Sequence, residues 1–354
     1  MTQKNYNKEI YIKKILLKWY KYNARELPWR KKIGIKNLPN PYYVFISEFM
    51  LQQTTVGTVK KRFEEFILKW PNLEVLEKIS NSKILNFWSG LGYYSRATNL
   101  LKSAKIIKRK FKNKIPNNYE DLITLPGIGD YTAKAILGIA YNQPVMPLDA
   151  NIERILARIY GYRLPLQKIK QRLRIKSKYF ISKNSSTNLI QAFMDYGSII
   201  CKPRNPNCEE CVINTKCVSY KNNYQHTIPI KFKIKTKKIK KYSRAYIFFN
   251  EKNEILVRKR SSKGMLASML EVPNDNWVIN KDDLVHDKFV IKVKKKLQFK
   301  GLTEYSFSHF DLETEVFLIK VKKNIFPDQK WIKKNNITKS GLPTVMKKIV
   351  KTAL

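Results

Sequence analysis

The stretch that decides the fold of the first two-thirds of the chain is LPGIGDYTA, which runs from Leu125 to Ala133. It lies between two segments with helical apolar patterns, and its glycines, Gly127 and Gly129, permit positive φ and a tight turn. The helix that follows begins with backbone amides that have no partner inside the helix. These amides lie at the positive end of the helix dipole and suit a phosphate. This is the layout of a helix-hairpin-helix, a motif that contacts the nucleic-acid backbone without reading sequence.

The charge of the chain points the same way. Lys and Arg number 70 against 27 Asp and Glu, which gives a formal net charge of +43 over 354 residues. Such an excess favours a polyanionic partner, with nucleic acid the first candidate. Because Lys, Asn and Ile are frequent throughout, as AT-rich genomes tend to produce, part of the excess reflects composition alone. No apolar run is long enough to span a bilayer and the first ten residues are polar, so we expect a soluble protein of a reducing compartment.

The only cysteines of the chain are confined to one short stretch with the spacing C-x6-C-x2-C-x5-C: Cys201, Cys208, Cys211 and Cys217. Thiolates this close can hold one iron–sulfur cubane or one zinc ion. Zinc modules usually pair two C-x2-C hooks across a longer gap. The single hook therefore favours one [4Fe–4S] cluster over zinc or unligated thiols, and disulfides are a poor fit. The basic neighbours Lys202, Arg204 and Lys216 would let such a rigid loop hold a phosphate.

The character of the chain changes after the cysteines. Before them, apolar residues at i, i+3, i+4 and i+7 predict helices, as in Ile152–Ile159. A basic run without helical period begins at Ile228, and strand-like runs follow at Ala245–Phe249, Glu254–Val257 and Thr314–Val321. Pro343 then opens a terminal helix with Val345, Met346 and Ile349 inward.

We therefore predict a multidomain protein, with an all-α helix-hairpin-helix domain followed by a smaller α+β domain. The predicted boundaries are 1–222 for the helical domain, including the cysteine loop at 201–217, then 223–241 for a basic linker and 242–354 for the α+β domain.

One carboxylate interrupts an apolar helix. Glu48 stands in VFISEFML, where Val44, Phe45 and Leu51 are its helical neighbours. A carboxyl in that setting loses solvent, so its pKa should rise and it can hold a proton near neutrality, as a general acid must. The alternative is a Glu at the edge of a helix face with its head in water.

A second carboxylate, Asp149, directly precedes the Ile152–Ile159 pattern. One interpretation is a plain helix N-cap. The functional interpretation uses the same position, because the helix dipole and amides should keep Asp149 ionised, and an ionised carboxylate stabilises an oxocarbenium ion. One acid kept neutral and one kept charged divide the labour of glycosidic cleavage.

The chain closely resembles the adenine DNA glycosylases of the MutY family, within the endonuclease III-like helix-hairpin-helix superfamily. The matching segments follow family order and cover nearly all of the first 220 residues: LPWR (27–30), SEFMLQQT (47–54), WSGLGYYSRATN (88–99), LPGIGDYTA (125–133), LDANIERILAR (148–158), MDYGSIIC (194–201) and the cysteine loop. Some of them, including the cysteine spacing, are shared with endonuclease III.

This resemblance implies excision of adenine mispaired with 8-oxoguanine or guanine in double-stranded DNA. The family's acid falls on Glu48, which would protonate adenine N7. The second carboxylate falls on Asp149, which would stabilise the sugar cation, with Asn151 helping to orient this part of the site. Arg30 and Gln191 match positions that contact the flipped adenine.

Gln53 and Tyr93 match residues that wedge into the base stack where the adenine leaves, a step that costs roughly a few kcal/mol. The alternative for Tyr93 is a core aromatic. At Tyr131, superfamily members that also cut the strand place a lysine that forms a Schiff base, which a phenol cannot do. Because Lys134 is one helical turn further on and should face elsewhere, we expect a monofunctional enzyme.

The last third resembles the Nudix-like recognition domain of the same family. The match rests on ILVRKRSSKGMLASMLEVP (255–273), the triplet Phe307-Ser308-His309 and LPTVMKKI near the end. The R-E-x-x-E-E metal cluster of a working Nudix hydrolase is absent after Gly264, so pyrophosphate hydrolysis is not expected. In the family the triplet meets 8-oxoguanine, with Ser308 the hydrogen-bonding residue. The alternative is a loop that matches by chance.

Two rival functions stay open at this point. A bifunctional glycosylase/lyase for oxidised pyrimidines explains the cysteines, the hairpin and Asp149, but not Tyr131 or the added domain. The other rival is a DNA-binding protein without catalysis that uses its cluster as a redox sensor. The two carboxylates argue against it, because acids near a phosphate backbone weaken binding. We expect a monomer that acts on DNA in the bacterial cytoplasm.

Overall fold

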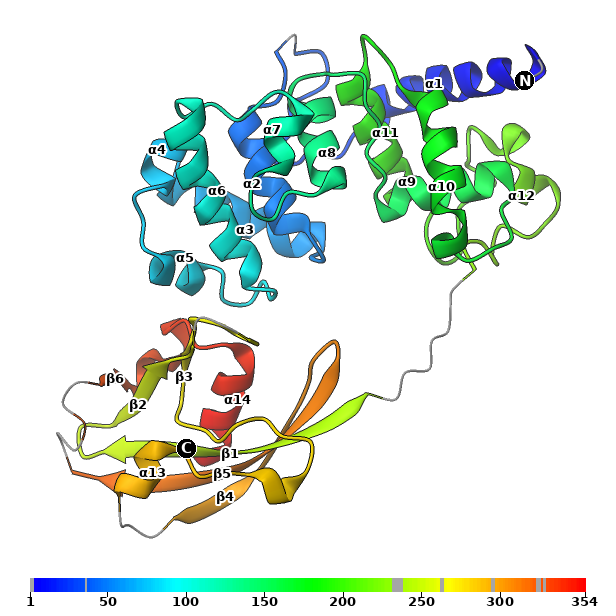
Figure 1. The fold of residues 1–354 in the computed structure, drawn as a ribbon. Helices are drawn as coiled ribbons and strands as arrows, with labels where there is room; N and C mark the ends of the chain where they lie inside the picture. The colour runs from blue at the N-terminus through cyan, green and yellow to red at the C-terminus, as the bar shows by residue number, and fades with distance from the viewer. Residues whose placement is uncertain are drawn as a thin grey trace. The chain divides into compact units, whose positions relative to one another are not determined.

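The computed structural model describes residues 3–35, 37–230, 238–261, 264–293, 297–322, 326 and 329–354. The chain divides into two compact units, one made of 1–78 and 99–234, the other of 79–98 and 235–354. Figure 1 labels the helices and strands of the chain. The grouping of 79–98 with C-terminal residues was not indicated by any sequence pattern. The predicted boundaries at 222 and 242 stay a prediction, and part of the predicted linker, 231–237, lies outside the described residues.

The first unit is helical, as predicted. Its helices are α1 (Gln3–Asn23), α2 (Pro41–Leu51), α3 (Val56–Lys69), α4 (Leu73–Leu76), most of α6 (Ser95–Phe111), α7 (Tyr119–Ile123), α8 (Asp130–Ala140), α9 (Ala150–Tyr160), α10 (Leu166–Ser177), α11 (Ser186–Ile199) and α12 (Val218–Lys221), with 3-10 turns at Lys178–Phe180 and Asn214–Lys216.

Apolar periodicity explains why α9 forms and which way it faces. Ile152, Ile155, Leu156 and Ile159 are all buried, which confirms the predicted inward stripe. Full burial of each such side chain contributes roughly 1.5–3 kcal/mol, so this stripe holds α9 against its neighbours α10, α11 and α12.

The hairpin between α7 and α8 has the predicted layout. Gly127 has φ +83°, and a Cβ there would lie 2.8 Å from Phe49 Cε1 and 2.9 Å from Asn99 Cβ, so only glycine fits. Gly129 has φ −106°, which any residue can adopt, so the turn uses positive φ at Gly127 and not at Gly129. A Cβ at Gly129 would meet open space, and its absence leaves room for a ligand at the start of α8.

The second unit combines α5 (Asn81–Phe87) with a sheet and two further helices. The strands are β1 (Ile239–Asn250), β2 (Glu254–Lys259), β3 (Leu270–Glu271), β4 (Gln298–Ser306), β5 (Phe310–Val321) and β6 (Lys330–Lys333); the helices are α13 (Lys288–Lys292) and α14 (Thr344–Ala353), with 3-10 turns at Lys281–Asp283 and Lys334–Lys339. The strand order is β3-β2-β1-β5-β4, with β6 on β2, and only the β1–β5 pairing is parallel among the described pairings.

Two apolar clusters lie in this unit. One joins strand residues such as Val316 to α14, whose Val345, Met346 and Ile349 are buried as predicted. The other contains Phe289 of α13. All three predicted strand runs are confirmed, but β1 begins at Ile239 rather than Ala245. Lysines mask the apolar alternation of its first residues, and pairing with β5 extends the strand through them.

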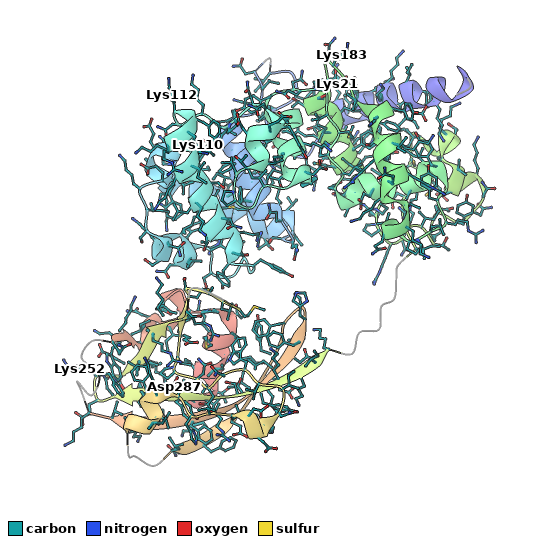
Figure 2. The ribbon with its side chains drawn as sticks, viewed as in Figure 1. Lys21, Lys110, Lys112, Lys183, Lys252 and Asp287 are labelled. Atoms are coloured by element: carbon teal, nitrogen blue, oxygen red, sulfur yellow. The ribbon has the colours of Figure 1, made fainter. Side chains whose placement is uncertain are left out.

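Lysine side chains project from the surface of both units. Figure 2 shows Lys21, Lys110, Lys112 and Lys183 on the helical unit and Lys252 on the other. Among the described residues, no helix is long and apolar enough to cross a membrane.

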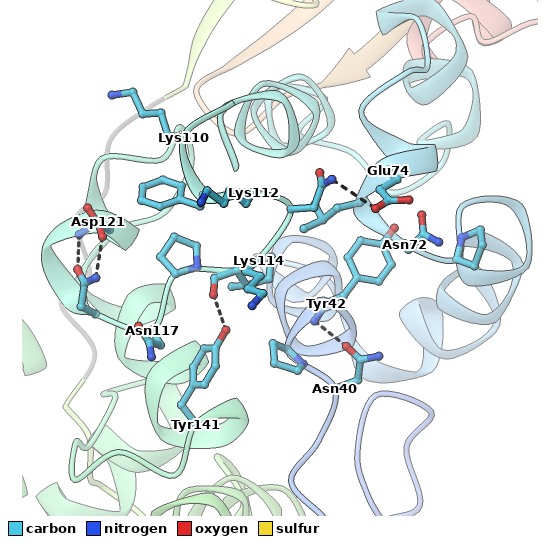
Figure 3. Close-up of a pocket in the computed structure, with 18 residues that line it drawn as sticks. Asn40, Tyr42, Asn72, Glu74, Lys110, Lys112, Lys114, Asn117, Asp121 and Tyr141 are labelled. Carbon is cyan, nitrogen blue, oxygen red and sulfur yellow. Dashed lines mark hydrogen bonds between the residues drawn. The ribbon is translucent and has the colours of Figure 1, made fainter. Parts of the chain in front are cut away.

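A cleft of about 800 Å³ opens on the helical unit between the start of α2 and the loop after α6 (Figure 3). Lys110, Lys112 and Lys114 line it together with Tyr42 and Tyr141, and the Tyr141 hydroxyl donates to the Ile115 carbonyl. None of the predicted site residues lines this cleft. Lysines close to the C-terminus of α6 also stabilise that helix through its dipole, which accounts for their presence without a ligand.

We predict that Ile349→Ala lowers the free energy of unfolding of the second unit by about 2–5 kcal/mol, because it leaves a cavity in the cluster under α14. Lys351→Ala, on the exposed side of the same helix, should change it by less than about 0.5 kcal/mol. Urea denaturation measures both. Equal effects of the two substitutions would contradict the packing of α14 described above.

Candidate active site

Glu48 lies inside the protein, in the second half of α2, and is 5% exposed. Burial raises its pKa from the ordinary 4.5 to about 7; the negative charge of Asp149 acts in the same direction, and the Tyr131 hydroxyl and Arg30 oppose them. The alternative interpretation, with the carboxyl head in water, is therefore wrong. At neutral pH a large fraction of Glu48 carries a proton.

Asp149 is the N-cap of α9, as predicted. Its Oδ1 accepts from the Ile152 amide at 2.7 Å, and its Oδ2 accepts from Asn151 Nδ2 at 2.7 Å. Burial nevertheless raises its pKa, although these hydrogen bonds and the charge of Arg154 favour the ionised form. We expected the helix end alone to keep Asp149 ionised, and burial turns out to oppose it.

A buried arginine connects this carboxylate to the cysteine loop. Arg154 Nη2 donates to Asn151 Oδ1 at 2.8 Å and to the Gly197 carbonyl at 2.7 Å. Its Nε donates to the Cys201 carbonyl at 2.8 Å. Gly197 also lets α11 approach closely, since a Cβ there would lie 2.6 Å from Asn151 Cβ. The orientation of Asp149 is thus fixed through Asn151 and Arg154.

Arg30 is held by a carboxylate with no exposed surface. Arg30 Nη1 donates to Asp195 Oδ2 at 2.7 Å, and Arg25 Nε donates to Asp195 Oδ1 at 2.7 Å. The Arg25 amide also donates to Asp195 Oδ2, at 2.9 Å. These charge-assisted bonds fix the Arg30 guanidinium close enough to Glu48 to lower the pKa of that carboxyl.

Gln191 lies one turn before Asp195 on α11 and is 3% exposed. Its Nε2 donates to the Thr187 carbonyl at 3.0 Å. Within the part of the chain that the structure describes, its Oε1 is a buried acceptor without a hydrogen-bond donor. Such an acceptor costs stability unless a ligand completes it.

The two predicted wedge residues share an unusual backbone. Gln53, just after α2, has φ +58°, and Tyr93, just before α6, has φ +44°. Both side chains are exposed, so the core-aromatic alternative for Tyr93 is wrong. Left-handed backbone at a bulky residue costs about 1–3 kcal/mol and is typical of functional sites.

Tyr131, in the first turn of α8, hydrogen-bonds Glu48. Burial raises the pKa of its phenol well above 10, so it stays neutral. Lys134 does face elsewhere: its Nζ lies 2.6 Å from Asp130 Oδ1 and over the Tyr119 ring.

The four cysteines line one cavity, together with residues of α9 and α11. Arg158 Nη1 donates to Cys201 Sγ at 3.3 Å, and the Tyr196 hydroxyl donates to Cys211 Sγ at 3.0 Å. Burial raises the pKa of Cys211 to about 11 and raises those of Cys208 and Cys217 as well, which a bound cation would reverse. Among the described residues, no three metal-ligating side chains meet around a single ion.

In the second unit, Phe307, Ser308 and His309 form the turn between β4 and β5. Ser308 and His309 are exposed at its tip, and Ser308 Oγ lies 2.9 Å from the Tyr93 hydroxyl. Phe307 instead packs against the core cluster. Glu271, the first acid after Gly264, is buried against Arg258 and Arg260 and is not available to a metal.

Sequence reasoning assigned no role to Arg154, Arg158, Asp195 or Arg25. A signal was present for Asp195, an aspartate in the otherwise apolar run LIQAFMDYGSII. A charge in such a run needs a buried partner, but sequence alone does not name that partner.

A helix-hairpin-helix together with a buried carboxyl on α2 and a partly buried one at the start of α9 is typical of a DNA glycosylase of base excision repair. The family models agree: "HhH-GPD superfamily base excision DNA repair protein" matches residues 46–177, and "NUDIX domain" matches 244–352. Among solved structures, a thermostable thymine-DNA glycosylase is 26% identical with a TM-score of 0.54, covering 61% of this chain and 98% of that one. An endonuclease III–DNA covalent intermediate, 20% identical with a TM-score of 0.52 over 63% of this chain and 99% of that one, shares the fold.

The adenine DNA glycosylase of Buchnera aphidicola subsp. Schizaphis graminum is 35% identical over 351 residues, which is 96% of this chain and 98% of that protein. The chain belongs to the adenine DNA glycosylase family. It is an enzyme of base excision repair that binds DNA and acts on adenine.

The raised pKa of Glu48 predicts a pH-dependent loss of stability. Between about pH 4.5 and 7 the folded protein holds a proton that the unfolded chain has released, so stability falls as pH rises through this window. Glu48→Gln does not titrate. Its stability relative to the parent protein should therefore grow by roughly 3 kcal/mol from about pH 4 to pH 8.

Denaturant unfolding at both pH values measures this difference. Glu65→Gln, on the surface beside Arg62, is the control for the loss of an exposed carboxylate. A flat difference for Glu48→Gln would mean that Glu48 has an ordinary pKa in the folded protein.

Proposed function

We propose that this enzyme excises adenine opposite 8-oxoguanine or guanine in duplex DNA, and that it cleaves the glycosidic bond without cutting the strand. The observation that carries the proposal is a pair of acids: buried Glu48 with a pKa of about 7, and Asp149, which accepts hydrogen bonds from two donors at the start of α9. One group can give a proton at neutral pH while the hydrogen bonds of the other favour its charged form.

In the proposed reaction, neutral Glu48 gives its proton to N7 of adenine. The C1′–N9 bond breaks, and its electron pair leaves with the base. The Asp149 carboxylate stabilises the oxocarbenium ion that remains on the sugar, and Asn151 and Arg154 hold that carboxylate in place. Water then adds to C1′ and its proton passes to the Glu48 carboxylate, which restores the acid.

Recognition of the flipped adenine falls to Gln191 and Arg30. The exocyclic amine of adenine is a donor, and the unpartnered Oε1 of Gln191 is a buried acceptor that such a donor would complete. Arg30, held by Asp195, would face the base as a rigid donor. A base without this exocyclic amine would leave the Gln191 Oε1 unpaired, so the pocket would discriminate against such a base.

Extrusion of the base falls to Gln53 and Tyr93. Their left-handed backbones present the side chains at exposed turns, where each can fill space left in the base stack. The backbone amides at the start of α8 would bind a phosphate of the DNA backbone. Because Tyr131 is a neutral phenol and Lys134 is paired with Asp130, we propose that no Schiff base forms.

The base opposite adenine would be read by the exposed tip of the β4–β5 turn, Ser308 and His309. Phe307 would support that tip from the core rather than touch the base. The +43 net charge supports steep salt dependence of DNA binding. We propose a monomer that works in the cytoplasm.

We also propose that Cys201, Cys208, Cys211 and Cys217 hold one [4Fe–4S] cluster. Four thiols around one cavity, with Arg158 and Tyr196 donating to two of the sulfurs, support it. When bound, the cluster would supply a rigid covalent tie across the loop, and Arg154 would couple that tie to Asn151.

The first test is single-turnover cleavage of a duplex with one adenine opposite 8-oxoguanine. The protein should release adenine, and the strand should break only after alkali. Glu48→Gln should bind the duplex equally well and lose roughly 100- to 10,000-fold in rate, whereas Glu65→Gln should match the parent protein. Strand breaks without alkali would contradict the monofunctional proposal, and unchanged release by Glu48→Gln would contradict the assignment of the acid.

Metal content tests the cofactor. Protein purified without oxygen should carry about four iron atoms and four sulfides per chain, and Cys211→Ser should lower the iron content. Elemental analysis and acid-labile sulfide measure both. Stoichiometric zinc in place of iron would overturn the cluster.

A further inference from the structure

The turn that would read the base opposite adenine needs support on two sides. The Phe307 amide donates to the Phe310 carbonyl at 2.9 Å and closes the turn. The Phe307 ring packs on Tyr305 and Phe310, with ring centroids 4.8 Å away in each case, and on Trp277 at 5.4 Å. These rings hold the inner side of the turn, and its exposed backbone side needs another contact.

Lys238 supplies that contact. Its Nζ donates to Ser306 Oγ at 2.6 Å and to the Phe307 carbonyl at 2.8 Å, and it lies 3.5 Å from Asp311 Oδ1. The Ser306 hydroxyl in turn donates to Asp311. An ammonium has three N–H donors, and here three acceptors from both ends of the turn face it. One side chain thus ties Ser306 just before the triplet, Phe307 at its start and Asp311, the second residue after its end.

The strand register explains why this lysine reaches the turn. β1 runs parallel to β5, with Ile239 beside Phe310 and Lys240 beside Asp311. Lys238 directly precedes β1, so it stands beside the triplet at the start of β5. Lys240 lies two residues further on and therefore on the same face of the sheet, but its Nζ pairs with Glu313 at 2.6 Å, beyond the turn. The two lysines are 40% and 47% exposed, so they form a matched pair with different contacts.

We propose that Lys238 is a positioning residue for recognition of the opposite base: it holds the backbone of the turn so that the Ser308 hydroxyl is presented to 8-oxoguanine. The inference rests on the proposed function of the turn. Guanine and 8-oxoguanine differ at N7, an acceptor in the first and an N–H donor in the second. A single hydroxyl discriminates between them only if its position is fixed, because hydrogen bonds weaken steeply with distance and angle.

The test compares Lys238→Ala with Lys240→Ala, which remove equal charge from neighbouring positions. Dissociation constants and single-turnover rates are measured on duplexes with adenine opposite 8-oxoguanine and opposite guanine. Loss of charge alone weakens binding to both duplexes equally. Lys238→Ala should also lower the preference for 8-oxoguanine by about fivefold or more, the effect of a lost charge-assisted hydrogen bond. Lys240→Ala should leave the preference unchanged.

Combination with Ser308→Ala separates positioning from general structure. If Lys238 acts through Ser308, then Lys238→Ala should not lower the preference further in the Ser308→Ala background. Additive losses would overturn the inference, and so would equal preferences for Lys238→Ala and Lys240→Ala. A parent protein with no preference for 8-oxoguanine would instead overturn the proposed function of the turn, and the inference with it. Matching thermal unfolding of the two lysine variants would show that both are folded.

Discussion

The guanidinium of Arg154 is the constraint on which the catalytic half of the molecule depends. It bonds the Ala150 and Gly197 carbonyls, the Asn151 side chain and the Cys201 carbonyl, and so joins the start of α9, the end of α11 and the cysteine loop. Arg158, one turn further along α9, bonds the carbonyls of Cys201 and Lys202. The loop that carries the four thiols is short. Its start is held in place by hydrogen bonds from these two buried, positively charged arginines to its backbone carbonyls.

The same principle, a buried charge answered by fixed partners, shapes the opposite wall of the site. Asp195 has no exposed surface, and two arginines neutralise it. Glu48 differs because it has no cation bonded to it in the described part of the chain and meets the cost of burial by keeping its proton. The protein therefore contains buried carboxylates in two distinct states: Asp195 is paired with two arginines, and Glu48 holds its proton up to about pH 7. That contrast arises from which neighbours each helix brings, because both side chains are buried.

Local patterns were sufficient for much of the fold. The inward stripe of α9, the α7–α8 hairpin and the inward residues of α14 all follow from periodicity and turn chemistry. The start of β1 was missed because its lysines hide the alternation, and only pairing with β5 extends the strand. In the candidate site, the burial of Glu48 and the N-cap position of Asp149 could be inferred from the residues next to each of them in the sequence. The links from Asp195 to Arg30 and from Arg154 to Cys201 could not be inferred, because these partners lie over 40 residues apart in the sequence and are brought together only by packing.

The left-handed backbone at Gln53 and Tyr93 bears on how this protein can be engineered. Glycine adopts such a conformation without the steric cost that a side chain carries, so selection for heat resistance alone would favour glycine at both positions. Each such exchange would remove a side chain that stands exposed at its turn. A more heat-resistant chain obtained in this way would keep its helices and its sheet while losing the two protrusions, and a screen that reads only melting temperature would not register the loss.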